Sequence, residues 1–450
     1  MTIKEKPKNK YPYYIEAPLE YKRVDAFLKA FSAILEHSNY KFILDLYTRI
    51  SMKCARCASG CQIYQTTGKP EDIPCYRSSI LLRIYKRHFT LGGWMKSKLT
   101  GGSGITEKDI DEMLESYYQC TACRRCTFYC PMGIEHGMIT HLGRYILAEI
   151  GIVPKALQVS VREQLEGASK NTSAIPVPAL IDTLEFLEEE IEETKGIKVK
   201  FPIDVEGAEY VFFAPVSDYL LEADTLMGMA CVLQTAGISW TIGTGNYDGI
   251  NYGLFYSDDF LGKIVRNEID EVRRLKGKKI LIGECGHASR TAKNFVPTYN
   301  EGSEIPVVNL LELTLKLLEE GKIELDPNVI TEKVTYHDPC NYVRSGWIIE
   351  QPRKIIKSFI KNFVEMTPNG KYNLCCGGGG GTVSVDEVKD FRMNAAGKKK
   401  ADQLRATGAD IVITPCANCK KQIEEVIEYF DLPMKRMGLH DLILKAIKLK

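Results

Sequence analysis

The sequence lacks any uninterrupted apolar run that approaches the ~18 residues needed to cross a bilayer as a helix. Residues 1–14 are basic and polar, and they contain no apolar core of a signal peptide. We therefore expect a cytoplasmic chain that has no transmembrane segment of its own.

The chain also lacks a charge excess of either sign. Its 59 Lys and Arg residues balance 58 Asp and Glu residues, and the formal net charge is +1. This balance gives no global field that would draw the chain onto nucleic acid, so we expect no nucleic-acid partner. With 450 residues, 44% of them hydrophobic, the chain is long enough for two or three globular domains.

Cysteine is what the sequence holds in quantity. Fifteen cysteines would suit a disulfide framework in a small secreted domain, but here they cluster at short spacings in a long chain. Such spacings are typical of thiolates that bind metal. Cys231, inside the apolar stretch Met227–Leu233, stands apart from them, and we expect it to be a buried core thiol.

The run Cys120-x-x-Cys123-x-x-Cys126-x-x-x-Cys130-Pro131 has the spacing of bacterial ferredoxins. In that arrangement three closely spaced thiolates hold one 4Fe-4S cube, and the fourth binds the neighbouring cube. A structural zinc site would instead need four ligands in two pairs. The run therefore predicts a 4Fe-4S cluster.

A second set of four cysteines lies upstream at Cys54, Cys57, Cys61 and Cys75, with irregular spacing. If the ferredoxin exchange of the fourth ligand applies, Cys54, Cys57 and Cys61 share a cluster with Cys130, and Cys75 joins the downstream set. The eight cysteines thus predict two cubane 4Fe-4S clusters that pass single electrons.

Beyond residue 205 short β-rich runs alternate with amphipathic helical stretches, which predicts α/β units with largely parallel sheets. The candidate strands are Tyr210–Phe213, Ile238–Ile242, Lys279–Ile282, Val334–His337 and Ile411–Thr414.

This half of the chain also repeats itself, because three landmarks recur in the same order at comparable separations. Val211–Val216 aligns with Thr335–Cys340, Tyr252–Ser257 with Tyr372–Gly377, and Ile282–Ala288 with Ile413–Cys419. In the second copy all five landmark positions are cysteine, whereas the first copy keeps only Cys285.

The expected organisation has five parts. They are a helical extension (1–45), an α-helical ferredoxin domain (46–150), a linker with a helix (151–204), a degenerate α/β copy (205–328) and a cysteine-bearing α/β copy (329–450). A turn-rich stretch at 167–178 marks the boundary ahead of the α/β half.

The second copy can hold a metal site of five thiolates, Cys340, Cys375, Cys376, Cys416 and Cys419. Five thiolates exceed the needs of one cubane. The run Gly377–Gly381 lets the backbone come close to a bulky cluster, because no Cβ intervenes. It lacks the Gly-Lys-Ser/Thr ending of a phosphate-binding loop.

Here the sequence resembles the Cys-Cys-Gly domain family, known from the B and D subunits of heterodisulfide reductase. The matching motifs are His337-Asp-Pro-Cys340, Leu374-Cys-Cys-Gly-Gly378 and Pro415-Cys-Ala-Asn-Cys419. From about residue 45 onward the chain is similar to the D subunit of that enzyme. It is also similar to the K subunit of the complex associated with dissimilatory sulfite reductase. The implied fold class is α+β and multidomain: a ferredoxin domain with two 4Fe-4S sites, then two pseudo-repeated α/β Cys-Cys-Gly domains.

The resemblance implies that the five cysteines ligate one non-cubane 4Fe-4S cluster, which reduces a disulfide or the trisulfide of a sulfur-carrier protein. It also implies an electron-donor partner, often a membrane haem b subunit. We accordingly expect a complex at the inner face of the membrane. Cys285, His287 and His337 are candidate proton donors to the departing thiolate.

Two other interpretations stay open. The chain is also similar to the small iron-sulfur subunit of anaerobic glycerol-3-phosphate dehydrogenase, which would make it a non-catalytic electron-transfer subunit. Alternatively, the five cysteines could bind zinc and the glycine run could be a flexible turn, although adjacent cysteines disfavour this.

Overall fold

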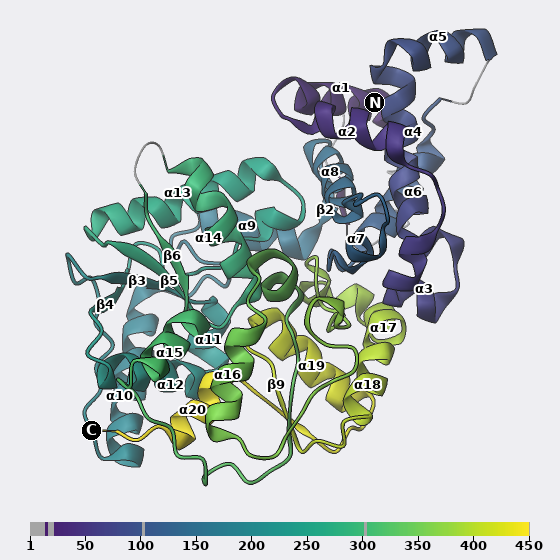
Figure 1. Cartoon of the computed structure of the whole chain (residues 1–450). Coiled ribbons are helices and arrows are strands. Elements are labelled where there is room, and N and C mark those ends of the chain that lie inside the picture. The colour runs from purple at the N-terminus through teal and green to yellow at the C-terminus, as the bar shows by residue number, and fades with distance from the viewer. Residues whose placement is uncertain (1–13, 17–21, 101–103, 301–303, 450) are drawn as a thin grey trace, which may run out of the picture. The chain divides into compact units, whose positions relative to one another are not determined.

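The computed structural model describes residues 14–16, 22–100, 104–300 and 304–449 (Figure 1). It comprises two compact units, each built from several segments of the chain. The first contains residues 1–159, 255–257 and 379–395, and the second contains residues 160–254, 258–378 and 396–450.

The first unit is mainly helical. Its helices are α1 (Arg23–Glu36), α2 (Tyr40–Ile50), η1 (Arg56–Gly60), α3 (Gln62–Thr67), η2 (Pro70–Asp72), α4 (Pro74–Phe89), α5 (Leu91–Thr100), α6 (Glu107–Tyr118), α7 (Arg125–Tyr129) and α8 (His136–Glu149). Strands β1 (Tyr14–Glu16) and β2 (Ile152–Pro154) pair antiparallel. The later segment adds η6 (Thr382–Ser384), η7 (Asp386–Val388), α17 (Lys389–Phe391) and most of η8 (Arg392–Gly397).

Sequence signals explain where two of these helices start. Pro74 stands in the first turn of α4, where its missing N–H removes no helical bond. Thr106 and Asp109 form a capping box at α6. The apolar faces of α1, α4, α6 and α8 enclose a core that includes Phe31, Tyr85 and Leu142.

The second unit is α/β, as expected. One sheet has the order β4-β3-β5-β6, from β3 (Tyr210–Phe213), β4 (Trp240–Ile242), β5 (Lys279–Ile282) and β6 (Val307–Asn309). The other has the order β10-β9-β7-β8, from β7 (Val334–Tyr336), β8 (Phe363–Val364), β9 (Ile411–Ile413) and β10 (Lys435–Met437). Every pairing in both sheets is parallel. The five predicted strands are confirmed to within two residues at each end.

The remaining helices precede, connect or follow these strands, and the first of them begins in the first unit. They are α9 (Lys155–Glu166), α10 (Val177–Lys195), α11 (Val216–Leu221), α12 (Ala223–Thr235), η3 (Tyr252–Phe255), α13 (Asp258–Arg274), α14 (Gly286–Tyr299), α15 (Leu310–Glu319), η4 (Tyr342–Gly346), α16 (Glu350–Phe359), η5 (Gly370–Tyr372), α18 (Lys398–Arg405), α19 (Ala417–Tyr429) and α20 (Leu439–Ala446). Cys231 is fully buried in α12, as predicted.

The two sheets have the same topology. The first strand of each, β3 or β7, lies between the second and the third, and the fourth lies outside the third. A repeated α/β unit requires this arrangement, although the repeat itself remains a prediction. Cys285 and Cys416 each follow the third strand by three residues. They therefore lie at the carboxyl ends of parallel strands, where α/β sheets place their ligands.

Among the described residues, no helix combines the length and the hydrophobicity that a membrane span requires.

Candidate metal sites

The two cysteine loops of the first unit have the same backbone shape. In each loop a cysteine stands between two residues of positive φ, and a short helix with the next cysteine follows. These residues are Lys53 (+49°) and Ala55 (+56°) around Cys54, and Ala122 (+50°) and Arg124 (+62°) around Cys123. Left-handed backbone at non-glycine residues is uncommon, so the match indicates that the loops correspond.

The correspondence fixes how the two runs align. Cys54, Cys57 and Cys61 match Cys123, Cys126 and Cys130, because the spacing is the same in both. The upstream loop has no counterpart of Cys120, since Ser51 stands there.

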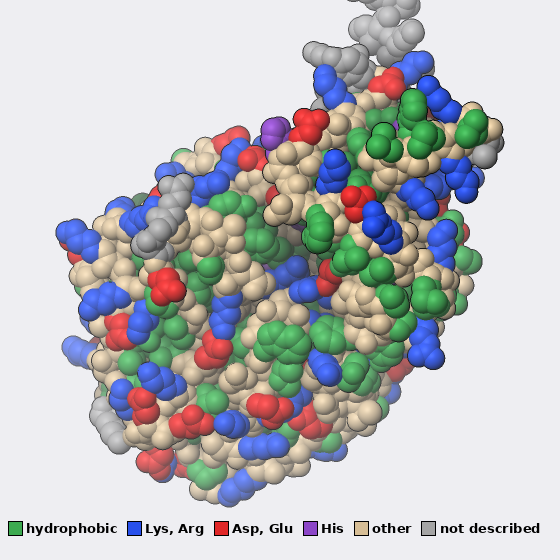
Figure 2. All heavy atoms as spheres, turned by 45° about the horizontal axis from the view of Figure 1, so that its top comes forward, with side chains coloured by type: hydrophobic (Ala, Val, Ile, Leu, Met, Phe, Trp, Pro, Cys, Tyr) green, Lys and Arg blue, Asp and Glu red, His purple; other side chains and the backbone are tan. Residues whose placement is uncertain are grey.

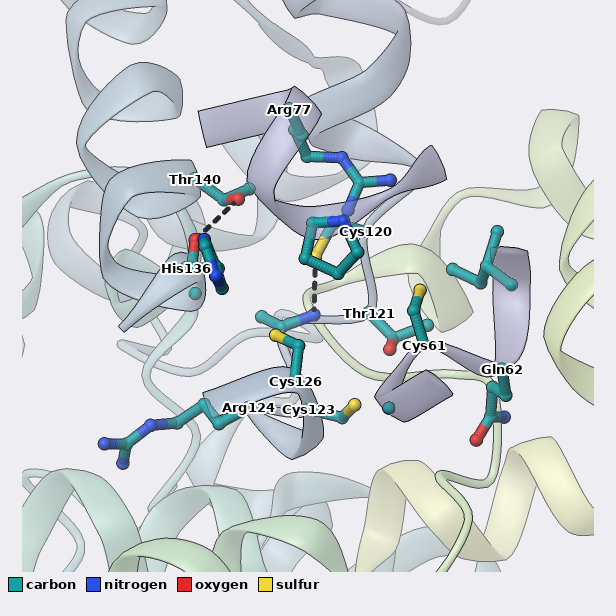
Figure 3. Close-up of a pocket in the computed structure, with 15 residues that line it drawn as sticks. Cys61, Gln62, Arg77, Cys120, Thr121, Cys123, Arg124, Cys126, His136 and Thr140 are labelled. Carbon is teal, nitrogen blue, oxygen red and sulfur yellow. Dashed lines mark hydrogen bonds between the residues drawn. The ribbon is translucent and has the colours of Figure 1, made fainter. Parts of the chain in front are cut away.

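One pocket of this unit brings Cys61 together with Cys120, Cys123 and Cys126 (Figure 3). Arg77 and His136 also line it, and both are buried. Burial lowers the pKa of His136 to about 4, so its imidazole is neutral at neutral pH. Four thiols around one pocket are the donor set that a 4Fe-4S cube requires.

Cys75 lies elsewhere, beside Cys57. A hydrogen bond between the two side chains raises the pKa of Cys57 and lowers that of Cys75 to about 6. The expected exchange, with Cys75 joining the downstream set, therefore disagrees with the structure. The reason is the spacing. Cys54, Cys57 and Cys61 correspond to the last three cysteines of the ferredoxin run, Cys123, Cys126 and Cys130, and not to its first three.

The second unit gathers buried thiols at the ends of its strands. Cys375 and Cys376 occupy a turn completed by Gly377, whose φ of +111° suits glycine only. The backbone N–H of Gly377 donates to Cys375 Sγ and that of Gly378 to Cys376 Sγ, each at 3.4 Å. These N–H groups stabilise negative charge on the sulfurs.

Side-chain hydrogen bonds link these thiols into a continuous series. Bonds to Cys375 and then Cys419 lower the pKa of Cys376. Bonds to Cys285 and then Cys419 lower the pKa of Cys416. Cys416 is the N-cap of α19, where the helix dipole also favours a thiolate.

Cys285 is a further thiol at this site. It is the N-cap of α14, and its Sγ accepts from the backbone N–H of Ala288 at 3.4 Å. Burial, followed by the bond to Cys416, raises the pKa of Cys285, so it keeps its proton at neutral pH. Cys340 differs from the other four predicted ligands because it is only half-buried.

His337 lies against the cysteines. Its ring and the sulfurs of Cys376 and Cys419 offer ligand atoms that all lie within 4.8 Å of one another. Its Nδ1 is 3.1 Å from Lys400 Nζ and 3.3 Å from Asn373 Nδ2. The sequence motifs gave no hint of Lys400, because only the fold brings α18 beside this loop.

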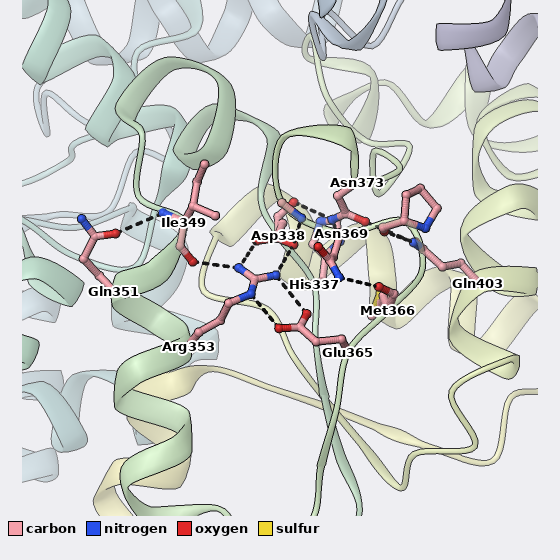
Figure 4. Close-up of polar contacts among 12 residues, drawn as sticks. His337, Asp338, Ile349, Gln351, Arg353, Glu365, Met366, Asn369, Asn373 and Gln403 are labelled. Carbon is pink, nitrogen blue, oxygen red and sulfur yellow. Dashed lines mark hydrogen bonds and ion pairs between the residues drawn. The ribbon is translucent and has the colours of Figure 1, made fainter.

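An ion-pair cluster fixes the loop that carries His337 (Figure 4). Arg353 donates from Nη1 and Nη2 to the two carboxylate oxygens of Asp338, each at 2.8 Å. Its Nε also donates to Glu365 at 2.7 Å. Such a bidentate pair defines the loop geometry between β7 and Cys340.

His287 is fully buried in α14, which follows β5 of the first sheet. Its Nε2 is 2.7 Å from the carbonyl oxygen of Asn251, and burial lowers its pKa to about 4. Nearby, Lys420 next to Cys419 lies 3.6 Å from Glu284 next to Cys285. This buried ion pair joins the segments that follow β5 and β9, each next to a cysteine.

Part of the glycine run belongs to the first unit. A Cβ on Gly379 would clash with Thr121 O, and one on Gly380 would lie 2.7 Å from Cys120 O. The sequence predicted that these glycines permit a close approach to a cluster. The structure shows that Gly379 and Gly380 permit close approach to the backbone of the ferredoxin loop, and the approach to a cluster remains a prediction.

Two family profiles match the chain: "4Fe-4S dicluster domain" over residues 52–134 and "Cysteine-rich domain" over residues 334–424. These matches agree with the predicted ferredoxin and Cys-Cys-Gly regions.

Relatives match most of the chain. The Hdr-like menaquinol oxidoreductase iron-sulfur subunit 2 of Archaeoglobus fulgidus is 27% identical over 96% of this chain and 84% of that protein. The D subunit of the dihydromethanophenazine:CoB–CoM heterodisulfide reductase of Methanosarcina mazei is 25% identical, over 88% of this chain and 93% of that protein. The EtfAB:quinone oxidoreductase of Syntrophomonas wolfei is 25% identical, over 88% of this chain and 57% of that protein. The resemblance predicted from the motifs is confirmed.

Proposed function

Because the chain is an iron-sulfur protein homologous to the D subunit of heterodisulfide reductase and to Hdr-like menaquinol oxidoreductase iron-sulfur subunits, we propose that it passes electrons to a disulfide- or trisulfide-reducing site. The observation that carries the proposal is the group of buried thiols Cys375, Cys376, Cys416 and Cys419, of which Cys376 and Cys419 lie within 4.8 Å of each other and of His337.

Three groups of residues would hold the clusters. Cys61, Cys120, Cys123 and Cys126 hold one cubane, and Cys54, Cys57, Cys75 and Cys130 hold the other. Cys340, Cys375, Cys376, Cys416 and Cys419 hold the non-cubane cluster. When bound, the clusters supply one-electron transfer and an iron site for sulfur.

Reduction of a disulfide consumes two electrons and two protons and releases two thiols. Cys340 is the half-buried member of its set, so its side offers the approach for a substrate sulfur. The other four sulfurs are buried and exclude water.

Of the three predicted proton donors, Cys285 carries a proton beside Cys416 at neutral pH, although the burial that raises its pKa makes it a weak acid. His287 is a neutral imidazole at neutral pH, because its pKa is about 4. Burial also lowers the pKa of His337, so neither histidine is a strong acid there.

The chain needs a partner for electrons, and a membrane haem b subunit that oxidises a quinol fits the proposal. The relatives' names support it, since one is a menaquinol oxidoreductase subunit and another a quinone oxidoreductase. The chain would then work at the cytoplasmic face of the membrane. The same names also support the second candidate, a subunit that relays electrons without reducing a sulfur substrate.

Anaerobic iron and sulfide analysis of the full chain, combined with EPR of the oxidised protein, tests the proposal. Three clusters should give about 12 iron per chain. An added thiol substrate should produce a paramagnetic signal. About 8 iron in fully loaded protein with no such signal would leave only the two cubanes and favour the electron relay.

A further inference from the structure

The tautomer of His337 follows from its neighbours. The amide nitrogen of Asn373 donates to the carbonyl oxygen of Asp338 at 2.9 Å, which identifies it as nitrogen. The amide oxygen of Asn373 accepts from Lys400 and Gln403, both at 3.3 Å. The group that faces His337 Nδ1 from Asn373 is therefore a donor.

Lys400 is the second neighbour of Nδ1, and an ammonium group only donates. With donors on both sides, Nδ1 must be the acceptor, so the ring carries its proton on Nε2. In the described part of the chain, Nε2 is buried and has no hydrogen-bond partner. A ring nitrogen of His337 and the sulfurs of Cys376 and Cys419 all lie within 4.8 Å of one another, so these sulfurs are the acceptors closest at hand for a cluster-loaded site.

We propose that His337 donates an Nε2–H···S hydrogen bond to the Cys376–Cys419 pair, and that Lys400 acts behind it as a buried positive charge, so that both raise the reduction potential of the cluster bound there. This inference rests on the proposed function, because it requires the third cluster. His337 and Lys400 are positioning residues in this scheme.

The physical basis is the charge that reduction adds. Hydrogen bonds to the sulfurs and nearby charge set the potential of an iron-sulfur cluster. Burial lowers the pKa of Lys400 to about 8, which leaves it protonated at neutral pH, and little solvent screens its charge from Cys376 and Cys375. Both groups therefore stabilise the reduced form more than the oxidised form.

The test is an EPR-monitored redox titration at fixed pH of the reconstituted full chain. The variants are His337→Phe and Lys400→Met. Lys398→Met is the control, because it removes the same charge from an exposed position of α18. At the wild-type midpoint potential we expect about tenfold less reduced than oxidised cluster in each variant, the worth of one charge-assisted hydrogen bond. The control should match the wild type.

Unchanged potentials in variants that contain the third cluster would overturn this inference and leave the proposed function intact. A wild type without the third cluster's signal would instead overturn the proposed function. A second measurement covers variants that fail to assemble: pulsed EPR of wild-type protein labelled with ¹⁵N-histidine. We expect a nitrogen coupling to the cluster, and its absence contradicts the hydrogen bond.

An independent observation concerns the surface of the first unit. No Asp or Glu occurs between Asp72 and Glu107, a stretch that contains six Lys or Arg residues. In α5 of this stretch, Leu91, Met95 and Leu99 are spaced by four residues and form one stripe, with Trp94 beside it. These four side chains are 82%, 53%, 86% and 49% exposed, respectively.

Basic side chains flank this stripe. Lys96 and Lys98 belong to α5, and Lys86 and Arg87 to the last turn of α4, against which α5 packs. Figure 2 shows hydrophobic side chains interspersed with Lys and Arg on this end of the unit. An apolar stripe with tryptophan, lysine and no acid has the chemistry of a helix that lies in a bilayer interface.

We infer that α5 inserts its stripe into the surface of an anionic lipid bilayer, to which the lysines are complementary in charge. The test is sedimentation of the full chain with vesicles of phosphatidylglycerol or of phosphatidylcholine. We expect the chain to bind the anionic vesicles preferentially. The double variant Leu91→Ser/Leu99→Ser should bind more than about tenfold more weakly, because it removes the two most exposed apolar side chains of the stripe.

The control is Val329→Ser, which removes an exposed apolar side chain from the second unit (43% exposed) and should bind like the wild type. Failure of the wild type to bind anionic vesicles at low salt would overturn the inference. Equal binding of the double variant would do the same, because it would assign the binding to another surface.

Discussion

Replacement of Cys376 by serine should lower the iron content from about 12 to about 8 per chain and abolish any disulfide reductase activity. Cys376 is a buried thiol beside Cys375, and its sulfur lies within 4.8 Å of the ligand atoms of Cys419 and His337. Serine offers a poor ligand for iron, so the whole cluster is lost rather than one bond. Anaerobic iron analysis with EPR measures the result, and the two ferredoxin signals should persist.

Two variants serve as comparisons. Cys231→Ala removes a fully buried thiol in α12 that lies outside the ligand sets, and it should keep about 12 iron. Cys285→Ser should also keep the cluster but lower turnover, if Cys285 delivers a proton. An unchanged iron content in Cys376→Ser would contradict the five-thiolate site. Loss of all iron would show that the change unfolds the chain.

Replacement of Arg144 by methionine should slow electron transfer from the ferredoxin clusters and destabilise the first unit. Arg144 is 1% exposed, and its guanidinium donates to backbone carbonyls of three chain segments. The contacts are Tyr117 O and Cys120 O at 2.7 Å, Gly380 O at 2.8 Å and Phe255 O at 3.3 Å. Each buried carbonyl left without a partner costs about 1–3 kcal/mol.

The functional effect follows from chain geometry. Gly380 is four residues from Cys376, so their Cα atoms are at most about 15 Å apart along the chain. Arg144 holds this segment against the loop of Cys120, which keeps a cluster-bearing loop and the glycine run together. Stopped-flow reduction of the cluster at Cys376 should slow, and the urea midpoint should fall.

The exposed Arg49 of α2 gives the matched control, since Arg49→Met removes the same charge without buried partners. It should leave both the rate and the urea midpoint near wild-type values. A normal rate in a destabilised Arg144→Met protein would assign Arg144 a purely structural role. Normal stability and rate together would contradict the inferred contribution of its hydrogen bonds.

The cysteine spacing predicted the kinds of site, but the structure places Cys75 beside Cys57 and Cys61 with the downstream set. The run ending in Cys130-Pro131 indicated a ferredoxin cube, and the match to a dicluster domain agrees with it. The partner of that run could not be chosen securely, because several alignments of Cys54, Cys57, Cys61 and Cys75 satisfy a sequence pattern. The positive φ values of Ala55 and Arg124, which follow Cys54 and Cys123, show which of these alignments is correct.

Parallel strands could be predicted for a simpler reason. Short β-branched runs separated by amphipathic helices leave few alternatives to βαβ units, and the strand bounds agreed closely. The predicted repeat also identified Cys285 as a candidate site residue, because it aligns with Cys416. Its contact with Cys416, however, depends on how the two sheets pack, which local pattern does not encode.

By itself, then, the sequence determined the chemistry of this protein: thiolate ligands in fixed spacings, and glycines where a Cβ could not fit. These are properties of residues that are neighbours in the chain, so the sequence alone is enough to recognise them. Only the tertiary structure decided which buried charges lie beside the cysteine loops. Lys400 and Arg144 lie 24 and 236 residues, respectively, from Cys376 and Gly380 in the chain. Their effect arises because burial brings them close and removes the water that would screen them.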